Sequence, residues 1–307
     1  MKLKFTFIFN FWLRQSRAGR GVPVAVATVL ALAGATASAQ DRPYFVTYSH
    51  DLEEPGALEI AVSPVFARQR GAGDFLAGWT ELEYGVKGWW TSALYFSGQG
   101  TRHDSTLFTG VRWENRFRPL MHEHRVNPVL YVELERINGA DKIMRGIVGH
   151  DGEVGHAEPN AIARGEIKKE IETKLILSSN VRGWNFSENL IAEKNFAEEE
   201  WELGYAMGLS RPLALAARPD DCTMCPENFS AGVELYGGLG THRDFGLRDT
   251  SHYLGLLLGW DLPSGMGLKI SPAFGLNDRS HRFVLRWALS YEFSGFGRGL
   301  RRIATGR

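Results

Sequence analysis

The amino-acid sequence predicts an all-β fold, a transmembrane antiparallel up-and-down β-barrel of about twelve strands, with roughly ten to fourteen possible. Three observations support this fold: long segments with alternating apolar and polar side chains, aromatic residues near the segment ends, and an export signal at the start of the chain. No window contains the ~18 consecutive apolar residues of a transmembrane helix, which excludes a polytopic helical membrane protein. With 44% hydrophobic and 23% charged residues, wholesale disorder is also excluded.

The first 39 residues have the pattern of a Sec signal peptide. Residues 1–21 contain five basic residues and no acidic residue, and a run of small and aliphatic residues follows at 22–35. Ala37-Ser38-Ala39 then matches the small-x-small pattern that signal peptidase accepts. We therefore predict cleavage after Ala39. Residues 40–55 are then expected to form a periplasmic lead-in, residues 56–293 the barrel, and residues 294–307 a basic C-terminal tail.

The charge of the chain is unevenly distributed along its length. The whole sequence has 35 basic and 35 acidic residues, and the leader holds five of the basic ones, so 30 basic residues face 35 acidic ones after cleavage. Without the four arginines of the tail, the body from residue 40 to 293 has 26 basic against 35 acidic residues. A balanced charge with no basic block excludes a dedicated nucleic-acid binder. An acidic barrel with an open lumen would favour cations.

Period-two alternation identifies the strands in order along the chain. We predict them at 58–67, 76–86, 89–97, 106–117, 128–137, 170–179, 184–193, 199–210, 229–240, 252–262, 266–276 and 282–293. The clearest examples are 200–210 and 283–293, where one face is aromatic and aliphatic and the other is small or charged. Segments of ~9–12 residues match tilted transmembrane strands better than the shorter strands of soluble sheets.

The connections and two prolines refine this prediction. Lys87-Gly88 and Pro263-Ser264-Gly265 predict tight periplasmic turns, and the longest link, 138–169, falls on the opposite side, as in outer-membrane barrels. Pro64 and Pro272 lie inside predicted strands, where proline deletes a ladder hydrogen bond. We expect a bulge at Pro64 and a locally open seam at Pro272.

Taken together, the leader, the alternating segments, the tight turns and the final strand ending Leu289-Ser290-Tyr291-Glu292-Phe293 resemble Gram-negative outer-membrane β-barrel proteins. The stretches at 202–205 and 232–238 are similar to a porin-like family associated with phenol-degradation operons, often called the MetA-pathway family. That family is presumed to move small hydrophobic compounds or to act as a pore. Such barrels usually end on the aromatic residue that the assembly machinery recognises, whereas fourteen residues follow Phe293 here.

The resemblance implies an outer-membrane location and a narrow channel, transporter or structural barrel. Its partners would be outer-membrane lipids, the barrel assembly machinery and small solutes, with no nucleic acid, cofactor or metal. From the phase of the alternation we predict that charged side chains line the lumen, and the candidates are Glu81, Glu83, Arg112, Glu114, Arg116, Glu202, Glu234 and Arg286.

Three further interpretations remain open at this level. Cys222 and Cys225 predict a small structural disulfide in an oxidising compartment, because Pro226 replaces the histidine of a haem attachment motif. His103 and Ser105, two residues apart at a strand start, suggest an outer-membrane lipid acyl hydrolase as an alternative function. A soluble secreted β-sandwich with a binding role is the other alternative.

Overall fold

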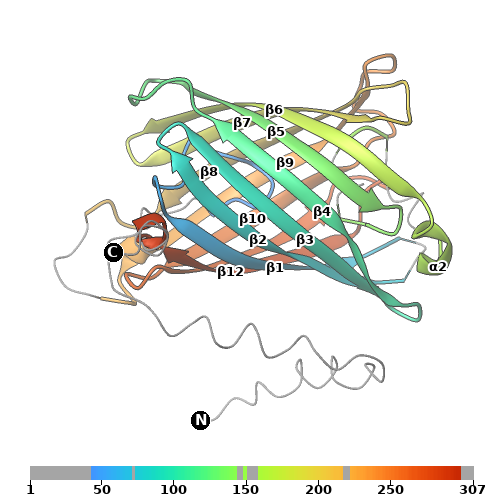
Figure 1. Cartoon of the computed structure of the whole chain (residues 1–307), viewed down its shortest axis with the longest axis horizontal. Helices are drawn as coiled ribbons and strands as arrows, with labels where there is room; N and C mark the ends of the chain where they lie inside the picture. The colour runs from blue at the N-terminus through green and yellow to red at the C-terminus, as the bar shows by residue number, and fades with distance from the viewer. Residues whose placement is uncertain (1–42, 71–72, 144–147, 151–157, 217–221, 299–307) are drawn as a thin grey trace, which may run out of the picture. The chain divides into compact units, whose positions relative to one another are not determined.

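A computed structural model describes residues 43–70, 73–143, 148–150, 158–216 and 222–298. Its twelve strands form one closed barrel in which each strand pairs antiparallel with its sequence neighbours and the last strand pairs with the first (Figure 1). The strands are β1 (Leu58–Arg68), β2 (Phe75–Lys87), β3 (Trp90–Thr101), β4 (Thr106–Phe117), β5 (Asn127–Asn138), β6 (Ile167–Val181), β7 (Trp184–Asn195), β8 (Glu202–Pro212), β9 (Phe229–Thr241), β10 (His252–Asp261), β11 (Met266–Gly275) and β12 (Phe283–Phe293).

The twelve-stranded antiparallel barrel is confirmed, and each predicted segment overlaps one strand. A β-sandwich is excluded because all strands belong to a single closed sheet rather than to two packed sheets. Two short helices lie in links: α2 (Asn160–Ala163) between β5 and β6, and the 3-10 helix η3 (Pro226–Asn228) between β8 and β9. Among the described residues, no helix is long and apolar enough to span a membrane.

The two faces of the sheet have opposite chemistry. On β10, the side chains of Leu254, Leu256 and Leu258 are exposed outward, whereas Tyr253 and Leu257 are buried inside. The same alternation on the other strands places most exposed large apolar residues on the outside and most buried polar residues on the inside. A closed sheet with an apolar outer surface and a polar interior is the arrangement that spans an outer membrane.

The links define two ends of the barrel. At the terminal end, β1 begins, β12 ends, and short turns join β2 to β3 and β6 to β7. Arg182 (φ 52°) and Gly183 (φ 83°) form the latter turn, because a two-residue hairpin of this hand needs positive φ at both positions. The loop end holds the longest link, residues 139–166, between β5 and β6. The predicted alternation of shorter turns and longer loops is therefore present only in part, because the β4–β5 link (118–126) and the β8–β9 link (213–228) at the terminal end are longer than several loops of the other end.

Aromatic side chains gather at the terminal end. Trp90 stacks on Phe117 with ring centroids 6.0 Å apart, and Phe229 stacks on Trp260 at 5.6 Å. Trp90 also donates from Nε1 to the side-chain oxygen of Asn115. Amphipathic rings at this position are typical of the boundary between hydrocarbon and headgroups.

Each strand proline interrupts the ladder on one side only. Opposite Pro64, the β1–β12 ladder skips from Val62 to Val65 without a change of register, and the β10–β11 ladder skips the positions opposite Pro272 in the same way. The expected open seam at Pro272 is present. The bulge expected at Pro64 is wrong, because one missing N–H donor removes a rung but does not require an extra residue.

Candidate functional site

The lumen wall is the candidate site, because it collects nearly all the buried charge of the barrel. The structure places the side chains of all eight predicted lumen residues on inward positions of β2, β4, β8, β9 and β12. Six of the eight are buried, while Glu81 and Glu202 are partly exposed. Arg116 pairs with Glu83 and, from Nε, with Glu114 Oε1 at 2.8 Å.

Five carboxylates form a continuous row across the wall. Glu114, Glu133, Glu172, Glu193 and Glu202 lie directly opposite one another on the consecutive strands β4 to β8. Directly opposed like charges destabilise a sheet unless other groups compensate them. We call this set the acidic row.

Basic side chains compensate part of the acidic row. Arg112 Nη1 lies 3.3 Å from Glu133 Oε1, and Lys174 Nζ lies 2.8 Å from Glu172 Oε1. The charge of the whole inner face nevertheless remains negative. Inward acidic residues are Glu59, Glu81, Glu83, Glu114, Glu133, Glu135, Glu170, Glu172, Glu193, Glu202, Glu234, Asp261 and Glu292, against the inward basic residues Arg112, Arg116, Lys168, Lys174, Lys269 and Arg286.

The eight lumen candidates include only Glu114 and Glu202 of the acidic row. On β5 the inward side chains after Asn127 are the apolar Val129 and Tyr131, and the face becomes acidic only at Glu133 and Glu135. Because the inward positions of β5 are partly apolar and partly charged, the sequence of this strand does not show which of its two faces lines the lumen. Only the cross-strand register shows that these carboxylates line up.

Carboxylate oxygens of Glu133, Glu135 and Glu172 lie within 4.8 Å of one another. Such oxygen-only sets suit hard cations such as Ca²⁺ or Mg²⁺. Arg112 and Lys174 already contact two of the three carboxylates, so the set works as part of the charged wall.

Residues 43–54 lie inside the barrel, which corrects the expected periplasmic lead-in. Their polar partners are inward side chains of β3, β4, β6, β7 and β9. We call residues 43–54 the lumen segment. It was missed because it has neither helical nor strand periodicity, and its partners are distant in sequence.

Glu234 holds the centre of the lumen segment. The backbone N–H groups of Phe45, Val46 and Thr47 all donate to Glu234 Oε1, at 2.9, 3.0 and 2.8 Å. The carboxylate is 1% exposed. Hydrogen bonds to a charged acceptor are about twice as strong as neutral ones, so this carboxylate is a main anchor of the segment.

Tyr48 is the second anchor. Its hydroxyl donates to Glu114 Oε2 at 2.9 Å, and its backbone exchanges two hydrogen bonds with the amide of Asn189, at 2.6 and 2.9 Å. Lys174 Nζ lies 4.6 Å from the ring centroid, and the ring of Tyr131 lies 5.1 Å away. The segment therefore contacts the acidic row directly.

His50 attaches the segment near the terminal end. Its Nδ1 lies 2.8 Å from Ser178 Oγ, and its Nε2 lies 3.1 Å from Glu123 Oε2 in the β4–β5 link. Beyond it, the backbone N–H of Glu53 donates to Thr91 Oγ1 at 3.1 Å. The segment thus enters the lumen, reaches mid-strand level at Glu234 and returns to the terminal end, where β1 starts.

The β5–β6 link enters the lumen from the other end. The Gln99 side chain binds both the carbonyl of Ala140 (2.8 Å) and the backbone N–H of Lys142 (3.0 Å). Ile143 and Val148 then join Val46 in one buried apolar cluster. The two segments meet inside the barrel, and a cavity of about 320 Å³ remains beside Tyr48, Tyr95 and Arg112, among other residues.

Burial shifts the pKa of two groups at the loop end. It lowers the pKa of His281 to about 4, with a further contribution from the nearby Arg286. Burial also lowers the pKa of Lys142, against the attraction of Asp104. His281 packs edge-on against the ring of Phe75. The positive charges of a protonated His281 and of Lys142 would both be poorly solvated in this part of the barrel.

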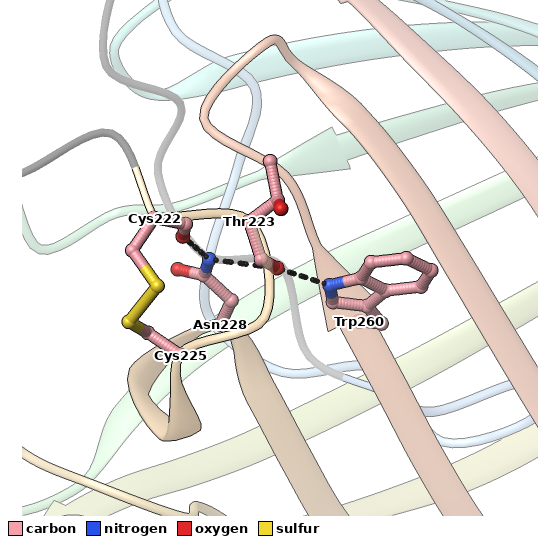
Figure 2. Close-up of a disulfide and its surroundings, with 5 residues drawn as sticks. All are labelled: Cys222, Thr223, Cys225, Asn228 and Trp260. Carbon is pink, nitrogen blue, oxygen red and sulfur yellow. Dashed lines mark hydrogen bonds between the residues drawn. A yellow bond between two sulfur atoms is a disulfide. The ribbon is translucent and has the colours of Figure 1, made fainter.

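The structure contains a disulfide between Cys222 and Cys225 in the β8–β9 link (Figure 2). The side-chain amide of Asn228 donates to the carbonyls of Cys222 and Thr223, and the indole of Trp260 donates to the Thr223 carbonyl at 2.8 Å. The bridge therefore belongs to a small hydrogen-bonded turn that is tied to β10 at the terminal end.

His103 and Ser105 do not form a nucleophile–base pair in this structure. Both side chains are exposed in the β3–β4 turn, and His103 has a φ of 62°, so the strand geometry that would put them on one face is absent. The described residues show no hydrogen bond between their side chains. The acyl hydrolase alternative has no support from this geometry.

Comparison with known structures places the fold. The barrel is similar to an outer-membrane channel from Pseudomonas putida F1, with a TM-score of 0.52 and 10% identity over 80% of this chain and 98% of that one. This chain has the fold of Gram-negative outer-membrane β-barrels. That fold agrees with the outer-membrane location that the sequence predicts.

A weaker similarity is to the NanC porin, with a TM-score of 0.45 and 8% identity over 77% of this chain and 98% of that one. Another is to LpxR from Salmonella typhimurium, with a TM-score of 0.42 and 8% identity over 76% of this chain and 99% of that one. No protein-family model and no curated protein match the sequence. Two predictions fall outside the described residues: cleavage after Ala39, and the part of the basic tail from residue 299 onwards.

Proposed function

We propose that this chain is a narrow outer-membrane channel for small cationic solutes, closed in the present state by the lumen segment. The observation that carries the proposal is the anchoring of residues 43–54 to the wall by reversible hydrogen bonds, chiefly those to Glu234 and Glu114. A segment held in this way can leave and return without breaking a covalent bond. Similarity to the fold of an outer-membrane channel supports a transport role.

The solute preference follows from the charge of the wall. Inward carboxylates exceed inward basic groups, and the acidic row extends over five neighbouring strands. A ring of carboxylates in a low-dielectric pore lowers the energy of a cation and raises that of an anion. A twelve-strand barrel is narrow, so small solutes fit the lumen better than large ones.

Reversal potentials in planar bilayers test the preference. We expect a barrel lacking residues 43–54, placed between unequal KCl solutions, to give a reversal potential of cation-selective sign. Substituting Glu193→Gln and Glu202→Gln should move this potential towards zero, while Glu188→Gln on the outer face should leave it unchanged. An anion-selective potential, or one that ignores the lumen variants, would refute the cationic preference.

A further inference from the structure

Three basic side chains meet on the outer face of the barrel near the loop end. Arg136 on β5 and Lys169 on β6 are directly opposite each other, and both are exposed. Lys194 on β7 pairs with Ile171, which puts it diagonally across from Lys169. All three occupy outward positions, as the buried inward neighbours Glu135 and Glu170 show. We call Arg136, Lys169 and Lys194 the outer basic cluster.

The cluster is unfavourable for an isolated barrel. Directly opposed like charges on one face of a sheet destabilise it. Within the described residues, Arg136 and Lys169 have no ion pair, and Lys194 Nζ donates to the backbone carbonyl of Glu198 at 2.8 Å. The positive charge on this surface is therefore available to an anionic group from outside the chain.

The depth of the cluster indicates which anion it meets. Towards the terminal end, the next outward positions are Leu134 and Ile171, which belong to the apolar outer face. Towards the loop end lie the exposed side chains of Ile167 and Phe196. The strands β5, β6 and β7 lie side by side there (Figure 1). The cluster therefore sits where an apolar belt gives way to the loops, which is headgroup depth in a membrane.

We propose that the outer basic cluster binds the phosphate groups of a phosphorylated lipid in the surrounding leaflet. Arginine and lysine side chains form strong charge-assisted hydrogen bonds to phosphate oxygens. The same lipid would lay its acyl chains along Leu134 and Ile171, whereas a free phosphate ion would use only the charges. This combination of basic and apolar contacts favours a lipid headgroup. The site is independent of the channel function proposed above.

The test uses the full-length protein in detergent micelles and measures its affinity for a phosphorylated disaccharide lipid. Replacing all three residues, in Arg136→Gln/Lys169→Gln/Lys194→Gln, should weaken binding about 100-fold, since each basic side chain near a lipid surface contributes about a factor of five. A control with three exposed basic residues of the opposite, terminal end replaced, Lys87→Gln/Arg125→Gln/Arg211→Gln, should bind as the wild type does.

Two further probes distinguish the source of the phosphate. The dephosphorylated lipid should bind the wild type as weakly as the intact lipid binds the triple variant, and inorganic phosphate should bind far more weakly than the lipid. Equal affinity of wild type and triple variant, equal affinity for the dephosphorylated lipid, or equal affinity for inorganic phosphate would each overturn the proposal. Heat-modifiable gel mobility checks folding. If the triple variant does not fold, Lys169→Gln alone should lower the affinity about fivefold.

Discussion

Substituting Glu234→Gln should release the lumen segment from the barrel wall. The native carboxylate accepts three backbone N–H bonds at 2.8 to 3.0 Å on one oxygen, and it is 1% exposed. A bond to a charged acceptor contributes about 1 kcal/mol more than one to a neutral acceptor. Because the three bonds share one oxygen, we expect the substitution to weaken the docked state by about 2–3 kcal/mol.

That weakening corresponds to a roughly 30- to 150-fold larger population of undocked segment. A thiol introduced by Val46→Cys reports this population, because Val46 is 7% exposed in the docked state and the two native cysteines are joined in a disulfide. The rate of labelling by a bulky maleimide should rise by the same factor in the Glu234→Gln background. Glu188→Gln, which removes a carboxylate from the outer face, is the matched control.

An unchanged labelling rate in the Glu234→Gln variant would refute the anchoring role of this carboxylate. An equal rise in the Glu188→Gln control would do so as well, because it would show that any loss of a strand carboxylate loosens the segment. Gel mobility before and after heating confirms that both variants keep the folded barrel.

Three other outcomes follow from the structure. Glu188 is exposed on the outer face between Leu177 and Met207. Glu188→Leu should therefore stabilise the membrane-embedded barrel by about 1 kcal/mol and raise its unfolding temperature. A lower unfolding temperature would contradict the lipid-facing position of Glu188. In the folded barrel His281 stays neutral down to about pH 4, whereas in the unfolded chain it is protonated below about pH 6.5. Acidification from pH 6.5 to 4 should therefore lower the local stability of the loop end, measured by amide hydrogen exchange, by up to about 3 kcal/mol. The His281→Asn variant should lose most of this pH dependence. Replacing both cysteines with serine should destabilise the β8–β9 link by about 2 kcal/mol and speed its proteolysis while the barrel stays folded; loss of the barrel would contradict the local role.

The strands were predictable because their signal is local. Alternation such as Phe283, Leu285 and Trp287 against Val284 and Arg286 depends only on neighbouring residues, and membrane depth fixes the length over which it persists. The inward phase of the eight lumen candidates follows from the same count. Tight turns at glycine likewise depend on two or three residues.

The filling of the lumen was not predictable in this way. Residues 43–54 bind partners such as Glu114 and Glu234, which are 66 and up to 189 positions away in the chain. Such contacts depend on the closed barrel, which brings inward side chains of many strands together around one segment. The acidic row has the same origin, because it requires the register of five strands rather than the pattern of any one.

Single-channel recording in planar bilayers tests the channel account most directly. Full-length protein and a variant lacking residues 43–54 are inserted into the same membrane and compared at the same voltage and salt concentration. The account predicts that the full-length barrel is mostly closed and that the shortened barrel carries a steady current. A shortened barrel that is folded but silent, or one with the same current as the full-length protein, would contradict it.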